Sequence, residues 1–362
     1  MNISAHEILI AVMAAFALLG AVDRILGNKF GIGKDFEEGI LAMGSLAMAM
    51  IGVITLAPVL ASVLKPVIVP VYRFLGADPA MFAGTILACD MGGGSLAQEL
   101  TADPQAALLG GVLTGSMLGA AVVFTIPVAM GILRPEDRGF MAKGMLCGIV
   151  TIPVGVLVGG LVAGFPLLMV LRNLIPIVLI AALIALGLWK FEKGMIKGFG
   201  VFGKLVIGLI TIGLTAAIVE ALTGFAIIPG MNPIENGFHT VGEIAIVLSG
   251  AFPLVYVLTK LLRKPLLKLG RLLGINDTAA GGLVASLANS IATFGLLKDM
   301  DDRGKVVNVA FAVSAAFVFG DHLGFAAGFA PEILPAMIVG KLTGGITAVA
   351  VALLLTKKKE LP

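Results

Sequence analysis

Long apolar runs, separated by short charged breaks, make up almost the whole chain. A helix that crosses a bilayer needs about 20 apolar residues, and runs of this size recur from one end of the sequence to the other. The pattern predicts ten or eleven membrane spans joined by short connections. The expected spans lie at 5–22, 39–63, 79–97, 106–131, 141–165, 168–189, 205–228, 240–260, 278–297, 306–330 and 333–355.

The composition agrees with this pattern. Hydrophobic residues make up 59% of the chain and charged residues 13%, and the mean hydropathy is +1.07. Soluble domains carry about 25% charged residues. We therefore expect an all-α polytopic membrane protein in which residues 1–362 form a single transmembrane domain. The small net charge of +3, with no long soluble domain and no basic stripe interleaved with aromatic residues, argues against nucleic-acid binding.

An internal repeat is visible at an offset of 198 residues, between units of approximately 39–131 and 237–330. Its clearest part is the junction Leu75-Gly76-x-Asp78, which corresponds to Leu273-Gly274-x-Asn276. Internal duplication is common in transporter folds, where binding sites lie between the halves. The repeat is parallel if every expected span crosses the membrane, and a re-entrant segment at a glycine-rich position would change that parity.

Asp90 stands inside an apolar run and is followed by Gly92, Gly93 and Gly94. A charge near the centre of a membrane helix costs about 2.5–3.5 kcal/mol, so such residues usually face a cavity, a partner or a substrate. Each of three glycines destabilises a helix by roughly 1 kcal/mol relative to alanine. A broken helix would expose carbonyl oxygens beside a carboxylate, which suits an ammonium group. The structural alternative is a glycine loop that Asp90 merely caps.

Asp321 and His322 form a second polar group inside an apolar run, directly after Gly320. The histidine can pair with a carboxylate, relay protons or sense pH. The alternative is a buried polar pair that only fixes helix packing. Since the repeat duplicates neither Asp90 nor Asp321, we expect an asymmetric site.

Further candidates are weaker. Glu220 is another acid within an expected span. Proline interrupts spans in Thr125-Ile-Pro127 and Thr151-Ile-Pro153, where kinked helices either line a pathway or simply pack. An aromatic wall for a cation would have to come from phenylalanines, such as Phe82, Phe319 or Phe325, because Trp and Tyr are scarce. The two cysteines lack metal-ligand spacing, so we expect no metal and no cofactor.

Several stretches resemble the ethanolamine permease family, whose genes accompany bacterial ethanolamine-utilisation enzymes. They are Ala21-Val-Asp-Arg-Ile-Leu26, Phe36-Glu-Glu-Gly39, Leu75-Gly-Ala-Asp-Pro-Ala-Met-Phe-Ala-Gly84, Asp90-Met-Gly-Gly93 and Phe319-Gly-Asp-His-Leu-Gly-Phe325. The resemblance implies a multi-pass protein of the bacterial inner membrane that admits ethanolamine.

That substrate suits the candidate residues. Ethanolamine is mostly protonated at neutral pH, so carboxylates would meet its ammonium group. Its hydroxyl would meet a small polar side chain, for which the candidates are Ser95, Asn289, Ser290 and Ser314. The resemblance supplies no residue roles, so these assignments come from the sequence itself.

Other functional classes fit the sequence less well. An intramembrane aspartyl protease needs two carboxylates that share a proton, but this chain lacks the Gly-x-Gly-Asp form and a following Pro-Ala-Leu. A structural or sensing protein without flux is the other class. Within transport, facilitated diffusion and proton- or sodium-coupled transport of ethanolamine or a related small organic cation both remain open. A small-residue face at Gly155-x3-Gly159 allows close helix contacts, including those of a homo-oligomer.

Overall fold

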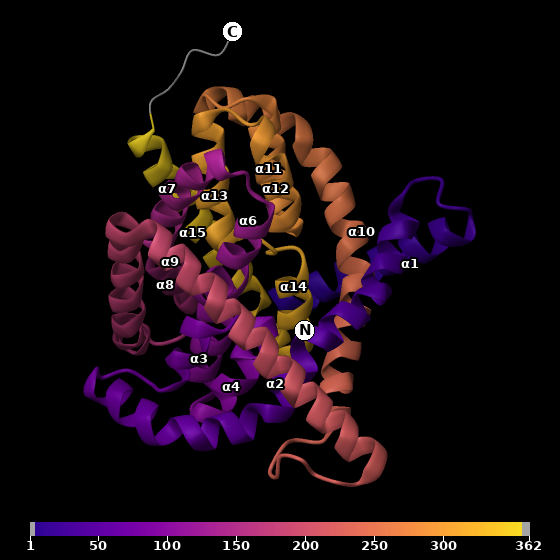
Figure 1. Cartoon of the computed structure of the whole chain (residues 1–362). Helices are drawn as coiled ribbons and strands as arrows, with labels where there is room; N and C mark the ends of the chain where they lie inside the picture. Colours follow the sequence, from indigo (N-terminus) through magenta and orange to yellow (C-terminus); the bar gives the residue numbers. More distant parts are fainter. Residues whose placement is uncertain (1–3, 357–362) are drawn as a thin grey trace.

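The computed structural model describes residues 4–356, apart from the side chains of residues 262, 263, 266, 269 and 271. All regular structure in this part of the chain is helical (Figure 1). The elements are α1 (Ala5–Ile25), α2 (Ile32–Phe74), α3 (Ala80–Ile86), η1 (Cys89–Met91), α4 (Gly93–Leu100), α5 (Pro104–Ala107), η2 (Leu108–Gly119), η3 (Ala121–Thr125), α6 (Ile126–Ile132), η4 (Pro135–Asp137), α7 (Arg138–Ile149), α8 (Ile152–Val162), α9 (Leu167–Thr223), α10 (Ile234–Leu273), α11 (Asp277–Ala288), α12 (Ser290–Leu296), η5 (Leu297–Asp299), α13 (Asp302–Ala315), α14 (Asp321–Phe329), η6 (Pro331–Ile333) and α15 (Leu334–Leu355).

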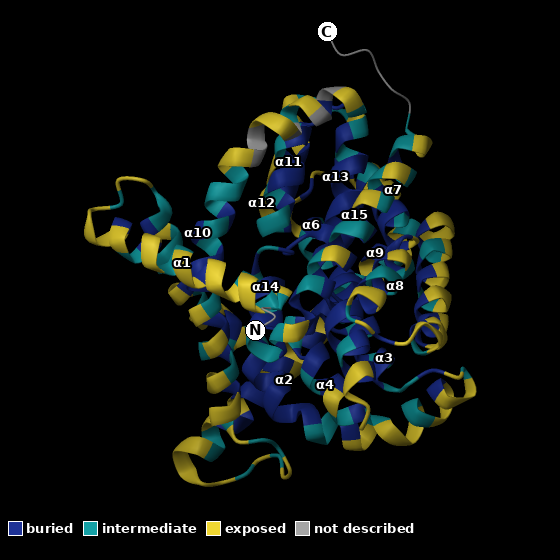
Figure 2. Ribbon diagram, turned by 180° about the vertical axis from the view of Figure 1, so that it is seen from behind, coloured by how far each residue is buried: buried dark blue, intermediate teal, exposed yellow. Residues whose placement is uncertain are grey.

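The expected helical membrane architecture is confirmed. Seven helical segments of the described chain are long and apolar enough to cross a membrane. Figure 2 shows buried residues gathered in the middle of the molecule, with exposed residues on the outward faces of the helices. Many exposed side chains are large and apolar, among them Leu183, Leu205 and Leu354. Such a surface suits lipid, because hydrocarbon solvates apolar side chains and leaves no backbone group unsatisfied on a helix.

The run expected to span at 79–97 folds back on itself instead. Helix α3 has only 7 residues, far fewer than a bilayer crossing requires. The backbone then turns through η1 and returns as α4. Thr101, after α4, donates a hydrogen bond of 2.9 Å to Asp78, before α3. Because the two ends meet, α3, η1 and α4 form a re-entrant hairpin, and Figure 1 shows it at the lower end of the molecule.

The run at 278–297 also folds back. Asn289 interrupts it in an extended conformation, with φ −156° and ψ 127°. Ser286 and Thr293, on opposite sides of the break, join their hydroxyls at 2.8 Å. At the base, the Asn276 amide donates to the carbonyl oxygen of Asp299 at 3.0 Å. Helices α11 and α12 therefore form a second hairpin, which lies at the upper end in Figure 1.

The other expected spans form helical segments, some of them irregular, which we interpret as crossings. Helix α9 covers two of them, because its backbone leaves helical geometry at Phe191 (φ −135°, ψ 41°). The run 306–330 crosses as α13 and α14 with a break between them. The run 106–131 crosses largely as the π-helices η2 and η3. π-Helical turns are rare in proteins, and those that occur are often found at functional sites.

These observations favour one sense of the repeat. After α2 the hairpin adds no crossing, and the chain then crosses through η2–α6, α7–α8, both halves of α9 and α10. Helix α10 is thus the fifth crossing after α2 and runs in the opposite direction. Gly76 and Gly274 end the two helices with nearly the same φ, +71° and +70°. We infer that the repeat units are inverted, with hairpins that enter from opposite sides.

The distribution of charge gives an orientation. Arg134, Lys190 and Lys260 lie at the end of the molecule where the second hairpin enters, together with most other Lys and Arg residues. In the described part of the chain, the opposite end holds Lys65, Arg73 and Arg172. Short cytoplasmic loops carry an excess of Lys and Arg. We infer that the second hairpin enters from the cytoplasm and the first from the opposite side.

The small-residue face is used inside the chain. Gly155 and Gly159 of α8 pack against the backbone of α15, where an added Cβ at Gly155 would lie 2.8 Å from the carbonyl oxygen of Gly340. Because α15 covers this face, another copy of the chain has no access to it.

The inverted arrangement can be tested by cysteine labelling. Ala102 and Lys298 are exposed residues at the bases of the first and second hairpins. In a background without Cys89 and Cys147, which are buried and free, we introduce Ala102→Cys and Lys298→Cys separately. An impermeant maleimide added to intact cells should label residue 102, whereas residue 298 should react only after the membrane is opened. Labelling of both positions from one side would contradict the inverted topology.

Candidate functional site

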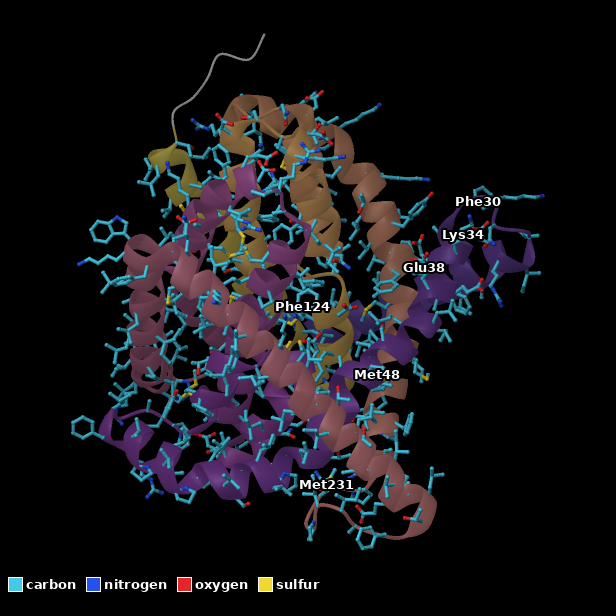
Figure 3. The ribbon with its side chains drawn as sticks, viewed as in Figure 1. Phe30, Lys34, Glu38, Met48, Phe124 and Met231 are labelled. Carbon is cyan, nitrogen blue, oxygen red and sulfur yellow. The ribbon has the colours of Figure 1, made fainter. Side chains whose placement is uncertain are left out.

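A cavity of about 730 Å³ lies between the tip of the first hairpin, the break before α14 and the middle of α9. Its walls come from α2, η1, η3, α6, α9 and the break before α14. Figure 3 places Phe124 and Met48 near the centre of the molecule, and Phe30 and Lys34 at the outlying turn between α1 and α2. The lining is mostly apolar, and its polar residues are Ser45, Asp90, Lys204, Thr211, Asp321 and His322.

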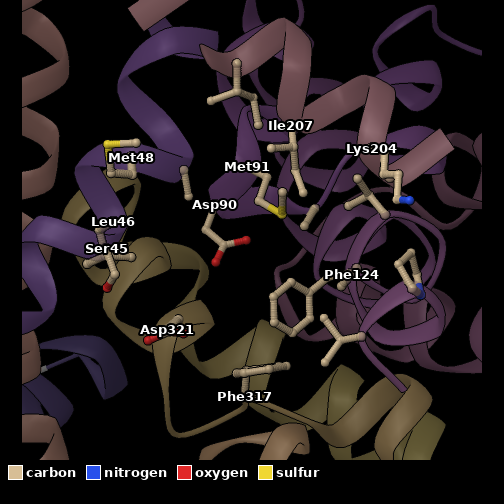
Figure 4. Close-up of a pocket in the computed structure, with 18 of the residues that line it drawn as sticks. Ser45, Leu46, Met48, Asp90, Met91, Phe124, Lys204, Ile207, Phe317 and Asp321 are labelled. Atoms are coloured by element: carbon tan, nitrogen blue, oxygen red, sulfur yellow. The ribbon is translucent and has the colours of Figure 1, made fainter. Parts of the chain in front are cut away.

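The tip of the first hairpin carries Asp90 into the cavity. Asp90 lies in η1, and Gly92 turns the chain from η1 into α4 with φ +94°. This left-handed conformation favours glycine, and an added Cβ at Gly92 would overlap Val53 of α2. Figure 4 shows the Asp90 carboxylate directed into the cavity. Its Oδ1 is buried and accepts no hydrogen bond from the described residues.

The break between α13 and α14 supplies Asp321 and His322 from the opposite half. Phe317 has φ +62°, an uncommon conformation for a bulky residue. The break is held by the second hairpin, because the backbone amides of Phe317 and Phe319 donate to carbonyl oxygens of Ser286 and Leu287 at 3.1 and 2.9 Å. Gly320 packs its Cα against the carbonyl oxygen of Ala288, so no Cβ fits there. Helix α14 then begins at Asp321, and Figure 4 shows this residue at the cavity wall.

A buried lysine connects the two halves. Lys341 of α15 is 1% exposed. Its ammonium group donates to the carbonyl oxygen of Ser116 and lies 3.0 Å from Nδ1 of His322. On the other edge of the imidazole, Nε2 lies 3.7 Å from Oδ1 of Asp90. The order Lys341, His322, Asp90 thus runs from the protein interior to the cavity.

Aromatic rings form one wall of the cavity. The Phe317 ring lies 5.5 Å from the ring of Phe124, edge to face, and 5.2 Å from that of His322. The phenylalanines considered from the sequence are elsewhere. Phe82 contacts Tyr72, and Phe325 stacks on Phe329, while none of Phe82, Phe319 and Phe325 belongs to the lining. The break before α14 therefore places Phe317, and none of those three phenylalanines, in the cavity wall.

One group of described residues has the composition of a metal site. Cys89, Asp90 and His322 each offer a ligand atom within 4.8 Å of the others. A metal-bound histidine normally donates its second ring N–H to a carboxylate or carbonyl acceptor. Here the second nitrogen of His322 faces the ammonium of Lys341, which is a donor. The environment of His322 thus suits an organic cation at Asp90 better than a metal ion.

The structure brings together only some of the residues expected from the sequence. Asp90, Asp321, His322 and Pro127 line the cavity. Gly92, Gly93 and Gly94 form the first hairpin's turn, and Gly320 precedes α14. The remaining candidates do not line the cavity, namely Ser95, Pro153, Glu220, Asn289, Ser290 and Ser314.

Most of these residues have identifiable structural environments outside the cavity. Asn289 caps α12 by accepting from the amide of Ile291. Ser290 and Ser314 are buried, with hydroxyls that have no hydrogen-bond partner in the described chain. Glu220 lies in the last turn of α9, where Gly224 caps its carbonyl oxygen. Pro153 occupies the first turn of α8.

The sequence analysis missed several residues at or near the site. Lys341 lies behind His322, and the cavity is lined by Ser45, Lys204, Thr211, Phe124 and Phe317. A signal for Lys341 was present, because it is an ionisable residue inside the apolar run 333–355. The criterion that selected Asp90 and Asp321 also applies to it. Ser45 has no comparable signal, since small hydroxyl residues are common in membrane helices.

Comparison with known proteins gives consistent matches. Residues 5–355 match the family described as "Ethanolamine utilisation protein, EutH". The chain is 60% identical over 355 residues to the probable ethanolamine permease EutH of Listeria monocytogenes, covering 98% of this chain and 95% of that protein. It is 49% identical to the protein of the same name from Salmonella typhimurium, with 98% and 96% covered. No solved structure matches significantly.

The conformation at Gly92 can be tested by stability measurements. Gly92→Ala should destabilise the protein, because a non-glycine residue in the left-handed region costs roughly 1–2 kcal/mol and the new Cβ overlaps Val53. Gly208→Ala is the matched control, since Gly208 lies within α9 and its Cβ would meet nothing within 4 Å. Thermal unfolding in detergent should show a lower midpoint for Gly92→Ala alone. Equal midpoints for the two variants would refute the proposed turn geometry.

Proposed function

The chain belongs to the EutH family of ethanolamine utilisation proteins, and we propose that it transports ethanolamine across the bacterial inner membrane. Its relatives from Listeria, Salmonella and Escherichia coli carry the name probable ethanolamine permease. A multi-pass helical protein with an internal cavity is the architecture that such an activity needs. The substrate would enter as the protonated amine, which lipid does not let through.

One observation carries this proposal from the structural side. Asp90 and Asp321, which come from opposite halves of the chain, line the same cavity. An ammonium group that leaves water loses its hydration, and the loss is large unless acceptors replace the water. The Asp90 side chain is 15% exposed, so a ligand in the cavity can reach its carboxylate. A charge-assisted hydrogen bond to this carboxylate would offset the desolvation of the substrate.

The remaining parts of the substrate also find matching groups. The ring faces of Phe124 and Phe317 suit a cation, because aromatic faces carry negative charge density. Ser45 and Thr211 donate their hydroxyl protons to carbonyl oxygens of their own helices, at 2.9 and 2.8 Å. Their oxygens can therefore accept a hydrogen bond from the hydroxyl of ethanolamine. They replace the serines and the asparagine considered from the sequence.

The arrangement does not favour a protease. Aspartyl proteases hold two carboxylates in contact so that they share one proton. No hydrogen bond joins Asp90 to Asp321 within residues 4–356, and Oδ1 of Asp90 lies 3.7 Å from Nε2 of His322. Figure 4 shows the two carboxylates on different sides of open space. We accordingly propose a carrier that moves its substrate without changing it chemically.

The proposed roles of the carboxylates can be tested by uptake assays. Asp90→Asn and Asp321→Asn should each weaken the uptake of radiolabelled ethanolamine into proteoliposomes. Loss of a hydrogen bond to a charged group costs about 1.5–3 kcal/mol, so we expect the apparent affinity to fall by roughly 10- to 150-fold at Asp90.

Glu220→Gln is the matched control, because it removes an acid of α9 that does not line the cavity. Its uptake should equal that of the wild type. The assay should run at mildly acidic pH, where little neutral ethanolamine leaks through lipid, with protein-free vesicles as the baseline. Normal uptake by both aspartate variants would refute the site, and absence of uptake by the wild type would refute the function.

A further inference from the structure

Lys341 is the charged group of the site that does not face the substrate. It is completely enclosed, and its ammonium is held by the carbonyl oxygen of Ser116 and by Nδ1 of His322. A lysine near the centre of a membrane protein is expensive and would be replaced easily by an apolar residue of similar size. Its burial directly behind the carboxylate site requires an explanation in terms of charge.

The hydrogen-bond geometry fixes how this charge acts. An ammonium group only donates hydrogen bonds, so Nδ1 of His322 accepts, and the ring proton is carried by Nε2. The imidazole is then neutral, and a second positive charge beside Lys341 would be unfavourable. Nε2 points toward Asp90 Oδ1 at 3.7 Å. The positive charge of Lys341 therefore lies one imidazole ring away from the carboxylate.

The formal charges of the groups at the site can be counted. In their ionised forms, Asp90 and Asp321 contribute two negative charges, and Lys341 contributes one positive charge. His322 is neutral in this geometry, and the buried Cys89 is a neutral thiol. Lys204 also lines the cavity, but it is exposed, so solvent screens its charge. Asp90, Asp321 and Lys341 thus carry one formal net negative charge, and a single monovalent cation completes the balance.

We propose that Lys341 is a built-in counter-cation that takes the electrostatic place of a co-transported ion. This inference rests on the proposed function, namely that the protein transports protonated ethanolamine. Without Lys341, two carboxylates would need two positive charges, such as an amine together with Na⁺ or H⁺. With Lys341, the monocationic amine binds and crosses alone. Transport is then driven by the membrane potential and the substrate gradient, without an inorganic co-ion.

The count also specifies the class of substrate. The site should prefer monocationic amines over dications of the same size, such as fully protonated 1,2-diaminoethane. Replacement of Lys341 by a neutral side chain of similar length should reverse this preference, because the vacated positive charge must come from the ligand. A lysine that served only packing would not produce such an exchange, since its replacement would weaken the binding of both ligands alike.

The wild-type protein provides the first test. In proteoliposomes with a potassium diffusion potential, ethanolamine should accumulate tenfold for each ~59 mV, the relation for one charge per substrate. Replacement of Na⁺ by N-methylglucamine, or imposition of a pH gradient, should leave this slope unchanged after subtraction of protein-free vesicles. Stimulation by Na⁺ or a proton gradient, or a slope of tenfold per ~30 mV, would overturn the proposal. Absence of any uptake would instead refute the proposed function.

The second test uses Lys341→Met with Lys298→Met as the matched control, because Lys298 is an exposed lysine outside the cavity. Lys341→Met should transport ethanolamine only with Na⁺ or a proton as the second cation, and ethanolamine should then accumulate tenfold for each ~30 mV of membrane potential, the relation for two charges. Without Na⁺, this variant should favour 1,2-diaminoethane at least tenfold over ethanolamine. Lys298→Met should behave as the wild type. A folded Lys341→Met protein that keeps the wild-type slope, or that is inactive with every cation and both ligands, would overturn the proposal.

Two further variants guard against misfolding of Lys341→Met. Lys341→Arg keeps the positive charge, so it should remain independent of Na⁺. The double variant Lys341→Met/Asp90→Asn removes one charge of each sign, so the net charge returns to that of the wild type and Na⁺ dependence should disappear, although ethanolamine binds more weakly. Na⁺ dependence of either folded variant would contradict the charge count, and the wild-type slope decides the question if neither folds.

Discussion

A charge that is buried in a membrane must be compensated by other groups of the protein, because hydrocarbon supplies neither hydrogen bonds nor counter-ions. The centre of this molecule is arranged around that requirement. The ammonium of Lys341 is bound by a backbone carbonyl oxygen and by an imidazole, and this imidazole faces Asp90. Each group thus provides its neighbour with a hydrogen-bond partner or with a compensating charge. The Asp90 side chain lines the cavity and is 15% exposed, so it remains accessible to a cationic ligand.

The same requirement governs the backbone at the places where helices break. An interrupted helix leaves amide and carbonyl groups unpaired, which is tolerated at membrane depth only inside protein or beside a water-filled cavity. Here the amides of Phe317 and Phe319 donate to the second hairpin. In the first half, the amide of Gly93 donates to the carbonyl oxygen of Ala88 within the hairpin's own turn. These breaks bring Asp90, Asp321 and Phe317 to the cavity.

The site therefore belongs to both halves of the chain and to neither alone. Asp90 comes from the first hairpin, His322 and Asp321 from the broken crossing of the second half, and Lys341 from the helix that follows it. Inverted halves of transporters commonly enclose their substrate in this way, with discontinuous helices at the midplane. The asymmetry has a physical consequence. Two like halves would duplicate the carboxylate, whereas this arrangement sets a lysine and a histidine behind one carboxylate and leaves a single uncompensated charge.

The sequence by itself determined the class of the protein and its most polar interior residues. Hydropathy is a local property, so the sequence alone showed the apolar runs of a multi-pass helical protein, and an aspartate within such a run is conspicuous wherever it lies. Only the tertiary structure decided which runs turn back as hairpins, because this depends on the contacts between Asp78 and Thr101 and between Ser286 and Thr293. It also decided that Glu220 lies away from the cavity and that Lys341 belongs to the site. Those placements depend on packing between residues far apart in the chain. A linear pattern of apolar and polar positions does not contain information about such packing.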